Sequence, residues 1–367
     1  MISYEKKRLK KFDYFLFFII SLLTIYGFFS IYIATGGTSY FKSQGAAFIL
    51  GIIAILVLSF IDYDIFGKLY LPIYIFSNIL LLAVLISGIG SSEWGASSWL
   101  VIGGISFQPS EIVKVGIIIS LAKFIENNSD NINEFLTLIK ILVFAFVPIG
   151  LVVLQNDLGT ALVFMFFTFI MLFVAGLDIK YILYSGLLGI ISIPIAWFGF
   201  FEDYQKKRLL VFLDPSLDPM GSGWNVTQAK TAIGSGQIIG RFITGNADFA
   251  TTGWLPEKHT DFIFAVIGES FGLIGGALLI LLYTLLIYRL IYIAKNAKDL
   301  FGSLVVVGIT SMISFHIIEN IGMTMGLMPV TGIPLPFISY GGTFMLTNMI
   351  ALGLVFSIAI KRSKINF

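Results

Sequence analysis

The chain has 367 residues, of which 57% are hydrophobic and 12% charged, with a formal net charge of +2 and a mean hydropathy of +0.95. Soluble domains carry about 25% charged residues, so this composition excludes an ordinary soluble protein. The absence of cysteine excludes disulfides, thiolate metal sites and a cysteine nucleophile. The net charge by itself says nothing about nucleic acid, and we expect no nucleic-acid partner.

Apolar stretches of membrane-spanning length recur along the whole chain. A spanning helix needs about 20 mainly apolar residues, and about ten stretches meet this requirement. In chain order they are 13–35, 44–61, 69–90, 109–125, 137–155, 158–176, 181–201, 261–289, 301–327 and 336–360. They must be helices, because an open sheet edge is not tolerated in hydrocarbon. We therefore expect one all-α polytopic membrane domain over residues 1–367, in which the first stretch is an uncleaved helix.

Basic residues at the ends of these stretches predict the orientation. They precede the first helix (Lys6, Lys7, Arg8, Lys10, Lys11), recur at alternate turns (Lys68, Lys123, Lys140, Lys180, Arg289, Lys295, Lys298) and follow the last helix (Lys361, Arg362, Lys364). We expect this side, with both termini, to face the cytoplasm. The long segment at about 202–260 and the shorter segment 88–108 then lie outside. Long ordered loops of this kind tend to be functional.

Charged residues within or beside membrane spans are costly and are candidates for function. Glu111 and Lys114 stand three residues apart on one face of the fourth helix, so they can pair. Such a pair either neutralises itself to permit burial or lines a polar cavity, and the sequence does not decide between the two. Asp157, between the fifth and sixth helices, is interpreted as a helix cap. His316 and Glu319 are interpreted as a hydrogen-bonded structural pair of the ninth helix rather than as a metal site.

The densest group of ionisable residues lies at 254–272, where the chain enters the eighth helix. Glu257, Lys258, His259 and Asp261 follow one another closely here. Asp261 is interpreted in two ways. It either caps the helix, aided by the helix dipole, or forms a partly desolvated carboxylate at a cavity mouth with a pKa suited to accepting a proton.

A second unusual segment is 329–346, in which three prolines and three glycines interrupt an apolar stretch. Irregular backbone at membrane depth is tolerated only where protein or a water-filled cavity covers it. We therefore expect a loop that dips inward beside the tenth helix, with Ser339 as a candidate cavity residue. The pattern predicts a polar, outward-facing cavity near Asp261.

Six stretches of the chain resemble the signatures of the SEDS family (shape, elongation, division and sporulation), and most closely its RodA branch. They are FQPSEIVK, QNDLGTA, AIGSG, LPEKHTDFIFAVIGE, NIGM and TGIPLPFISYGG, in order from residue 107 to residue 342. Two positions depart from the family pattern. Ser98 stands where the family has an arginine, and Asn156 stands where it has a proline, a change expected to alter only local stiffness.

The resemblance implies a peptidoglycan glycosyltransferase that polymerises lipid II on the outer face of the bacterial cytoplasmic membrane during cell elongation. It implies that Asp261 is the essential carboxylate, and that Glu111, Lys114 and Asp157 are sensitive positions. Glu257, His259 and Ser339 lie in matching stretches and are candidates for substrate contact. The diphosphate leaving group needs positive charge, either from a divalent cation (Mg²⁺ or Mn²⁺), for which the sequence shows no site, or from basic side chains. The expected partners are a class B penicillin-binding protein and other proteins of the elongation machinery.

Two other functions fit the same pattern. A lipid-linked precursor flippase also has many spans, buried charges and broken helices, but the chain shows no inverted repeat and its motifs gather on one side of the membrane. A non-catalytic scaffold for cell-wall synthases would have no need of Asp261.

Overall fold

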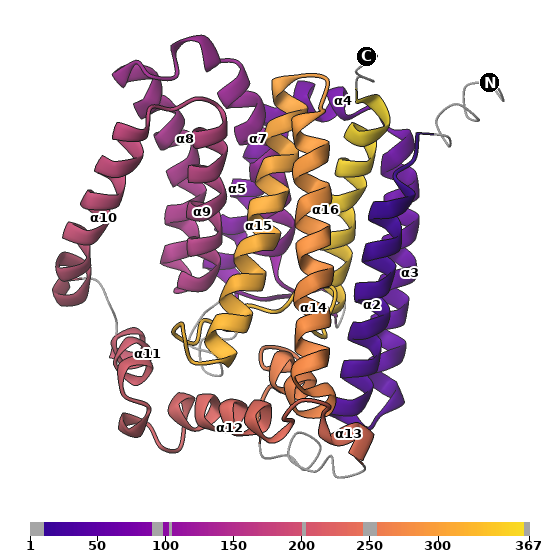
Figure 1. Cartoon of the computed structure of the whole chain (residues 1–367). Coiled ribbons are helices and arrows are strands. Elements are labelled where there is room, and N and C mark those ends of the chain that lie inside the picture. The colour runs from indigo at the N-terminus through magenta and orange to yellow at the C-terminus, as the bar shows by residue number, and fades with distance from the viewer. Residues whose placement is uncertain (1–10, 90–97, 103–104, 200–202, 245–254, 363–367) are drawn as a thin grey trace.

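The chain is a bundle of long helices, as the computed structural model shows (Figure 1). It describes residues 11–89, 98–102, 105–199, 203–244 and 255–362. The long helices are α2 (Tyr14–Thr35), α3 (Thr38–Phe60), α5 (Tyr70–Ser87), α7 (Pro109–Glu126), α8 (Phe135–Leu154), α9 (Leu158–Val174), α10 (Ile179–Gly199), α14 (Ile263–Lys295), α15 (Leu300–Thr324) and α16 (Gly342–Lys361). The predicted basic residues 6–10 and 364, and parts of the two predicted external segments, lie outside the described residues.

The predicted apolar stretches all became helices, with different ends in several cases. Within the described part of the chain, seven helices are long and apolar enough to cross a bilayer, and α9 is apolar but shorter. The last helix begins at Gly342 and not at residue 336, because the proline- and glycine-rich residues before it cannot continue a helix. The eighth predicted helix runs on to Lys295, beyond its predicted end at 289.

The segments predicted to be external are ordered by short elements. Residues 203–244 form α11 (Asp203–Leu213), the 3-10 helix η2 (Pro215–Leu217), α12 (Ser222–Ser235) and α13 (Arg241–Thr244). They lie together at one end of the bundle in Figure 1. The other segment contains a small antiparallel hairpin of β1 (Leu100–Ile102) and β2 (Ile105–Phe107). At the opposite end lie α4 (Tyr63–Lys68) and the 3-10 helix η1 (Ser129–Asn131).

Burial separates the central helices from those at the periphery. Of the most apolar part of α16, 83% is buried within the protein, against 17% for α5. The outward faces carry large apolar side chains such as Phe76 and Ile86, which are 59% and 87% exposed. Apolar outward faces are expected where lipid covers the protein. The chain is therefore a multi-pass membrane protein with α15 and α16 near its centre.

A buried carboxylate joins the two ends of the chain. Asp13 caps α2 by accepting from the Leu16 amide, and its side chain is fully buried. Arg289, near the end of α14, binds it at 2.8 Å, and Arg362, just after α16, binds it at 3.2 Å. The start of α2 and the end of α16 therefore lie at the same end of the bundle, as Figure 1 shows.

Replacing Asp13 with alanine is expected to destabilise the folded protein by about 2 kcal/mol, since it removes a helix cap and two charged hydrogen-bond partners. The loss stays moderate because both arginines are partly exposed and can be hydrated. The measurement is the midpoint of thermal unfolding in detergent. The surface pair Lys180–Asp178 offers a matched control, because both of its side chains are about half exposed. Asp178→Ala should change the midpoint little, and equal effects of the two variants would contradict this account.

Candidate functional site

The irregular segment between α15 and α16 folds back into the protein, as predicted. Leu335, Phe337 and Ile338 are at most 1% exposed. The Tyr283 hydroxyl of α14 donates a hydrogen bond of 2.6 Å to the Pro336 carbonyl. From α15, the Asn320 amide nitrogen donates to the Ile333 carbonyl at 2.8 Å. Since lipid cannot satisfy such carbonyls, these bonds allow a non-helical backbone to lie inside the bundle.

Ser339 connects this inward loop to the segment before α14. Its hydroxyl donates to the Thr260 carbonyl at 2.6 Å and accepts from the Leu335 amide at 2.8 Å. The next amide, of Tyr340, donates to the His259 carbonyl at 2.8 Å. Ser339 is 1% exposed. In this structure its side chain therefore positions the two loops that meet at Asp261.

A polar cavity of about 40 Å³ lies between α7, α9, α15 and the inward loop. It is lined by Gln108, Glu111, Lys114, Asp157, Thr160, Val163, His316, Thr331, Gly332, Ile333 and Pro334. A space of this size with several polar groups can hold water. The structure thus brings Asp157 together with Glu111 and Lys114, two predicted site residues that are more than 40 positions away in the sequence.

Lys114 is the central cation of this cavity. Its ammonium donates to Glu111 Oε1 at 2.9 Å and lies 3.1 Å from His316 Nε2. An ammonium group can only donate, so Nε2 is the acceptor and the imidazole proton lies on Nδ1. That nitrogen is 3.3 Å from the Pro334 carbonyl, which accepts its proton. Both interpretations of the Glu111–Lys114 pair therefore apply, because it is buried and it also lines a cavity.

Asp157 is a helix cap, as predicted, and a cavity residue as well. One carboxylate oxygen accepts from the Thr160 amide at 3.0 Å, and the other accepts from the Gln108 side chain at 3.0 Å. The preceding Asn156 has a φ of +61°. A proline ring cannot adopt this angle, so the departure at residue 156 changes the backbone path and not merely its stiffness. This part of the prediction was wrong.

His316 and Glu319 do not form the predicted pair. His316 contacts Lys114 and the Pro334 carbonyl, whereas Glu319 accepts a hydrogen bond of 2.8 Å from the Thr331 hydroxyl. Residues three apart share a helix face, but here each reaches a different part of the inward loop and its surroundings. Contacts with other segments, and not the helix spacing, therefore determine the partners of His316 and Glu319.

Asp261 is not a helix cap. The cap position of α14 is Phe262, and no side chain caps this helix. The main-chain carbonyl of Asp261 accepts from Asn320 at 2.8 Å. Its carboxylate has no hydrogen-bond partner among the described residues. It lies beside the cavity-lining Gly332, where a Cβ atom would be 3.3 Å from Asp261 Oδ2.

The surroundings of Asp261 favour its protonated form. Burial, followed by the negative charge of Glu257, raises the pKa of Asp261 to about 7, and the positive charge of Arg208 acts in the opposite direction. A carboxylate that titrates near neutral pH is well matched to general-base catalysis. The interpretation as a base at a cavity mouth is therefore consistent with both contacts and charge.

The other predicted residues of this segment lie close to Asp261 and, like Asp261 itself, are not among the residues that line the cavity. Glu257 is exposed and accepts from the Thr260 hydroxyl at 2.8 Å. His259 is half-buried, and its ring packs edge-on against Tyr40 with centroids 4.9 Å apart. Burial lowers the pKa of His259 and favours its neutral form. Neither side chain lines the 40 Å³ cavity.

A divalent cation in a protein binds several carboxylate or imidazole ligands at once. Among the described residues, no three His, Cys, Asp or Glu side chains are placed to hold a metal ion. Asp261 and Asp157 offer oxygen ligands, but they do not form a ligand set of this kind.

Several residues that build the site were missed from the sequence. Gln108 fixes Asp157, and Gln44 of α3 donates to the Ser339 carbonyl at 3.1 Å and accepts from the Gly341 amide at 3.1 Å. Tyr283 holds the inward loop from α14. A glutamine or tyrosine inside an apolar stretch is the signal that could have identified the last two residues.

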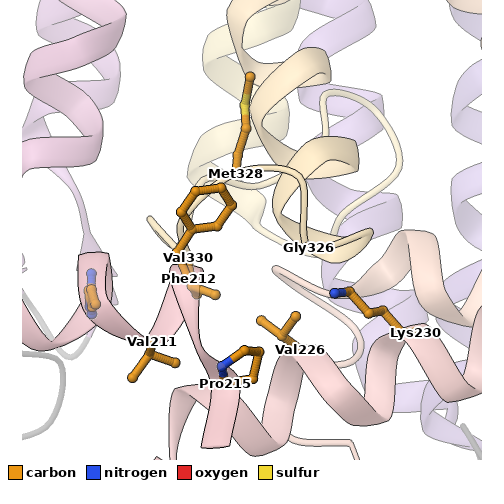
Figure 2. A pocket seen from close by; sticks show the side chains of 9 residues that line it. Val211, Phe212, Pro215, Val226, Lys230, Gly326, Met328 and Val330 are labelled. Carbon is orange, nitrogen blue, oxygen red and sulfur yellow. The ribbon is translucent and has the colours of Figure 1, made fainter. Parts of the chain in front are cut away.

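A second cavity, of about 10 Å³, lies between α11, α12 and the chain that follows α15 (Figure 2). It is mainly apolar, with Arg208 and Lys230 as its charged members. Lys230 reaches the backbone after α15, where a Cβ atom on Gly326 would lie 2.4 Å from its Nζ. A cation at this place is favourable because the carbonyl end of a helix carries partial negative charge.

Comparisons with known proteins agree with this architecture. A family model described as a cell cycle protein, FtsW/RodA/SpoVE, matches residues 9–364. Peptidoglycan glycosyltransferase MrdB of Escherichia coli K12 is 38% identical over 86% of this chain and 85% of its own. Stage V sporulation protein E of Bacillus subtilis is 36% identical over 95% of this chain and 96% of its own.

Solved structures show the same fold. A chain of a peptidoglycan synthase complex that coordinates polymerization and crosslinking superposes with a TM-score of 0.84. It is 31% identical and covers 95% of this chain and 97% of its own. The rod shape determining protein RodA of Thermus thermophilus superposes with a TM-score of 0.74 at 29% identity, over 96% of this chain and 98% of its own.

Proposed function

We propose, from the premise that the chain belongs to the FtsW/RodA/SpoVE (SEDS) family, that it is a peptidoglycan glycosyltransferase that polymerises lipid II during cell elongation. Curated relatives carry this activity in their names. The observation in this chain that carries the proposal is Asp261, a carboxylate beside a polar cavity with a pKa raised to about 7.

In the proposed reaction, Asp261 is the general base. The 4-hydroxyl oxygen of the acceptor sugar forms a bond to the anomeric carbon of the donor sugar. The bond from that carbon to the lipid diphosphate oxygen breaks, and the diphosphate leaves with the electron pair. Asp261 takes the hydroxyl proton. An α-linked donor then gives a β-linked product, and such inversion requires one displacement and one base.

The diphosphate leaving group needs positive charge as it departs. Lys114 is neutralised by Glu111, so this pair contributes a positioned donor rather than a net charge. The positive charge of Arg208 acts on Asp261, where it lowers the pKa of the carboxyl group. We propose that a divalent cation, Mg²⁺ or Mn²⁺, would enter with the diphosphate, since the described part of the chain offers no complete ligand set.

We also propose the orientation and the partner. The basic residues around the shared end of the termini support a cytoplasmic location for that end. Asp261, α11 and α12 would then face outside, where the lipid-linked substrate is polymerised. A solved relative belongs to a complex that couples polymerization to crosslinking, which supports a crosslinking partner such as a class B penicillin-binding protein.

The test is polymerisation of lipid II by the purified protein. It would be assayed with and without Mg²⁺ or Mn²⁺, and alone or with a class B penicillin-binding protein. Glycan ladders from wild-type protein are the expected result. Absence of ladders under every condition would contradict the proposal and favour a flippase or a scaffold. Transport of labelled lipid II across proteoliposomes without polymerisation would identify the flippase.

A further inference from the structure

Helix α14 is broken near its outer end. Gly272 has a φ of +63° and a ψ of −159°, which no helix contains. The break separates an outer part, 263–271, from the long inner part that ends at Lys295. Two amides just after the break find partners on another segment. The Leu273 amide donates to the Gln237 carbonyl at 2.8 Å, and the Ile274 amide donates to the Ile238 carbonyl at 3.2 Å.

Three glycines allow the two segments to meet backbone to backbone. A Cβ atom on Gly236 would lie 1.9 Å from the Gly268 carbonyl oxygen. On Gly240 it would lie 2.2 Å from the Ser270 carbonyl oxygen, and on Gly272 it would lie 2.6 Å from the Ile238 carbonyl oxygen. Each obstacle is a backbone atom, which cannot rotate away as the end of a side chain can. Any side chain at these positions would therefore push α14 away from the residues that directly follow α12.

Apolar packing extends this contact to the neighbour of Asp261. A small buried cluster joins α12 to the start of α14 and is separate from the main core. It consists of Ala229, Ala232, Leu255, Phe262 and Ala265. Phe262 directly follows Asp261 and is 2% exposed. The outer part of α14 is thus held along its whole length by α12 and the residues that follow α12.

The other side of α12 is fixed to α15. Figure 2 shows Lys230 and Val226 of α12 directed toward the chain after α15, around Gly326. Helix α12 therefore bridges the end of α15 and the outer part of α14. Asp261 lies at the end of that outer part, and a pivot at the Gly272 break would displace it from Gly332 and the cavity.

We propose that Gly236, Gly240 and Gly272 are positioning residues for Asp261: they fix the outer part of α14 to α12 and so hold the carboxylate at the cavity. The expected effect on catalysis rests on the proposed function, whereas the positioning of Asp261 does not. Misplacing a reacting group by about 1 Å can cost about 100-fold in rate. Loss of this backbone contact should therefore reduce polymerisation without unfolding the inner bundle.

The chain supplies matched controls for the test. Gly234 lies two residues before Gly236 and has open space for a Cβ atom. Gly276 lies four residues after Gly272 and would meet only the Phe264 ring, at an ordinary 3.8 Å. Gly236→Ala and Gly272→Ala should lower polymerisation at least about 10-fold, whereas Gly234→Ala and Gly276→Ala should keep the wild-type rate. Equal rates for all four variants would overturn the proposal.

A readout independent of activity uses the absence of cysteine from the chain. Asp261→Cys introduces a single thiol, whose maleimide labelling rate reports the exposure of this position. Adding Gly236→Ala should raise the labelling rate several-fold, and adding Gly234→Ala should leave it unchanged. Unchanged labelling with Gly236→Ala would overturn the proposal. A wild-type protein without polymerase activity would refute the proposed function, yet this labelling comparison would still decide the positioning role.

Amide hydrogen exchange of the wild-type protein tests the proposed backbone contact even if Gly236→Ala and Gly272→Ala do not fold. We expect 236–240 and 268–274 to exchange together and slowly, because their amides share one backbone contact. Fast exchange of 236–240 beside slow exchange of 268–274 would show two independent segments and overturn the proposal.

Discussion

Asp261→Asn is expected to lower the rate of lipid II polymerisation by about 10²–10⁴-fold, the usual contribution of a general base. Asparagine has nearly the same shape but cannot accept the proton. The fold should persist, because the Asp261 carboxylate neither caps α14 nor bonds to another described residue. The measurement is the initial rate of glycan formation, together with the unfolding midpoint of each protein.

Asp214→Asn is the matched control for this variant. Asp214 is an exposed carboxylate at the same end of the bundle, where it caps η2 by accepting from the Ser216 amide. Asparagine caps helices equally well, so rate and stability should both stay unchanged. If Asp261→Asn polymerises as fast as Asp214→Asn, Asp261 is not the base, although the protein would remain a polymerase.

The pH dependence offers a check on the same role. A general base works in its deprotonated form, so the rate should fall as the pH falls through the pKa of Asp261, which burial raises to about 7. An ordinary aspartate would lose its charge only at much lower pH, near 4. The expected profile therefore rises between about pH 6 and pH 8. A flat profile over this range would contradict an elevated pKa at the catalytic base.

Lys114→Met is expected to destabilise the protein by about 3–5 kcal/mol and to abolish polymerisation. The side chains of Lys114 and Glu111 are 1% and 7% exposed, so methionine would leave a buried carboxylate without its cation. His316 would also lose the donor at its Nε2. The unfolding midpoint and the glycan yield measure the two effects.

The same helix provides the control. Lys123 and Glu126 form a second pair with the same spacing, but their side chains are 31% and 23% exposed. Lys123→Met should therefore cost less than about 1 kcal/mol, because water can solvate the remaining carboxylate. The double variant Glu111→Gln/Lys114→Met should recover much of the lost stability but not the activity. Full recovery of activity in the double variant would show that the pair serves only to permit burial.

Apolar stretches and the scarcity of charge predicted the helical membrane bundle, because hydrocarbon tolerates few other backbone arrangements. The proline- and glycine-rich segment 329–346 predicted an inward loop, since its residues cannot continue a helix at membrane depth. The helix spacing of Glu111 and Lys114 predicted their pairing, which the 2.9 Å contact confirms.

Contacts between distant segments could not be predicted in this way. Asp157 and Asp261 both precede a helix, and the sequence allowed either to be a cap. Only the structure separates them: Asp157 accepts from the Thr160 amide, whereas the cap position of α14 is Phe262 and no side chain caps this helix. Likewise, His316 and Glu319 were expected to pair with each other. In the structure His316 contacts Lys114 of α7, and Glu319 contacts Thr331 of the inward loop.

The sequence alone thus indicated that this chain spans a membrane and which carboxylates are candidates for chemistry, because both inferences follow from local composition and helix periodicity. The tertiary structure decided which of those carboxylates share a cavity and which is desolvated. It also decided that α12 meets α14 through glycine. Desolvation and backbone contact depend on residues more than 30 positions apart in the chain, such as Gly236 and Gly268. The pattern of residues within a short stretch does not show which distant residues will contact that stretch.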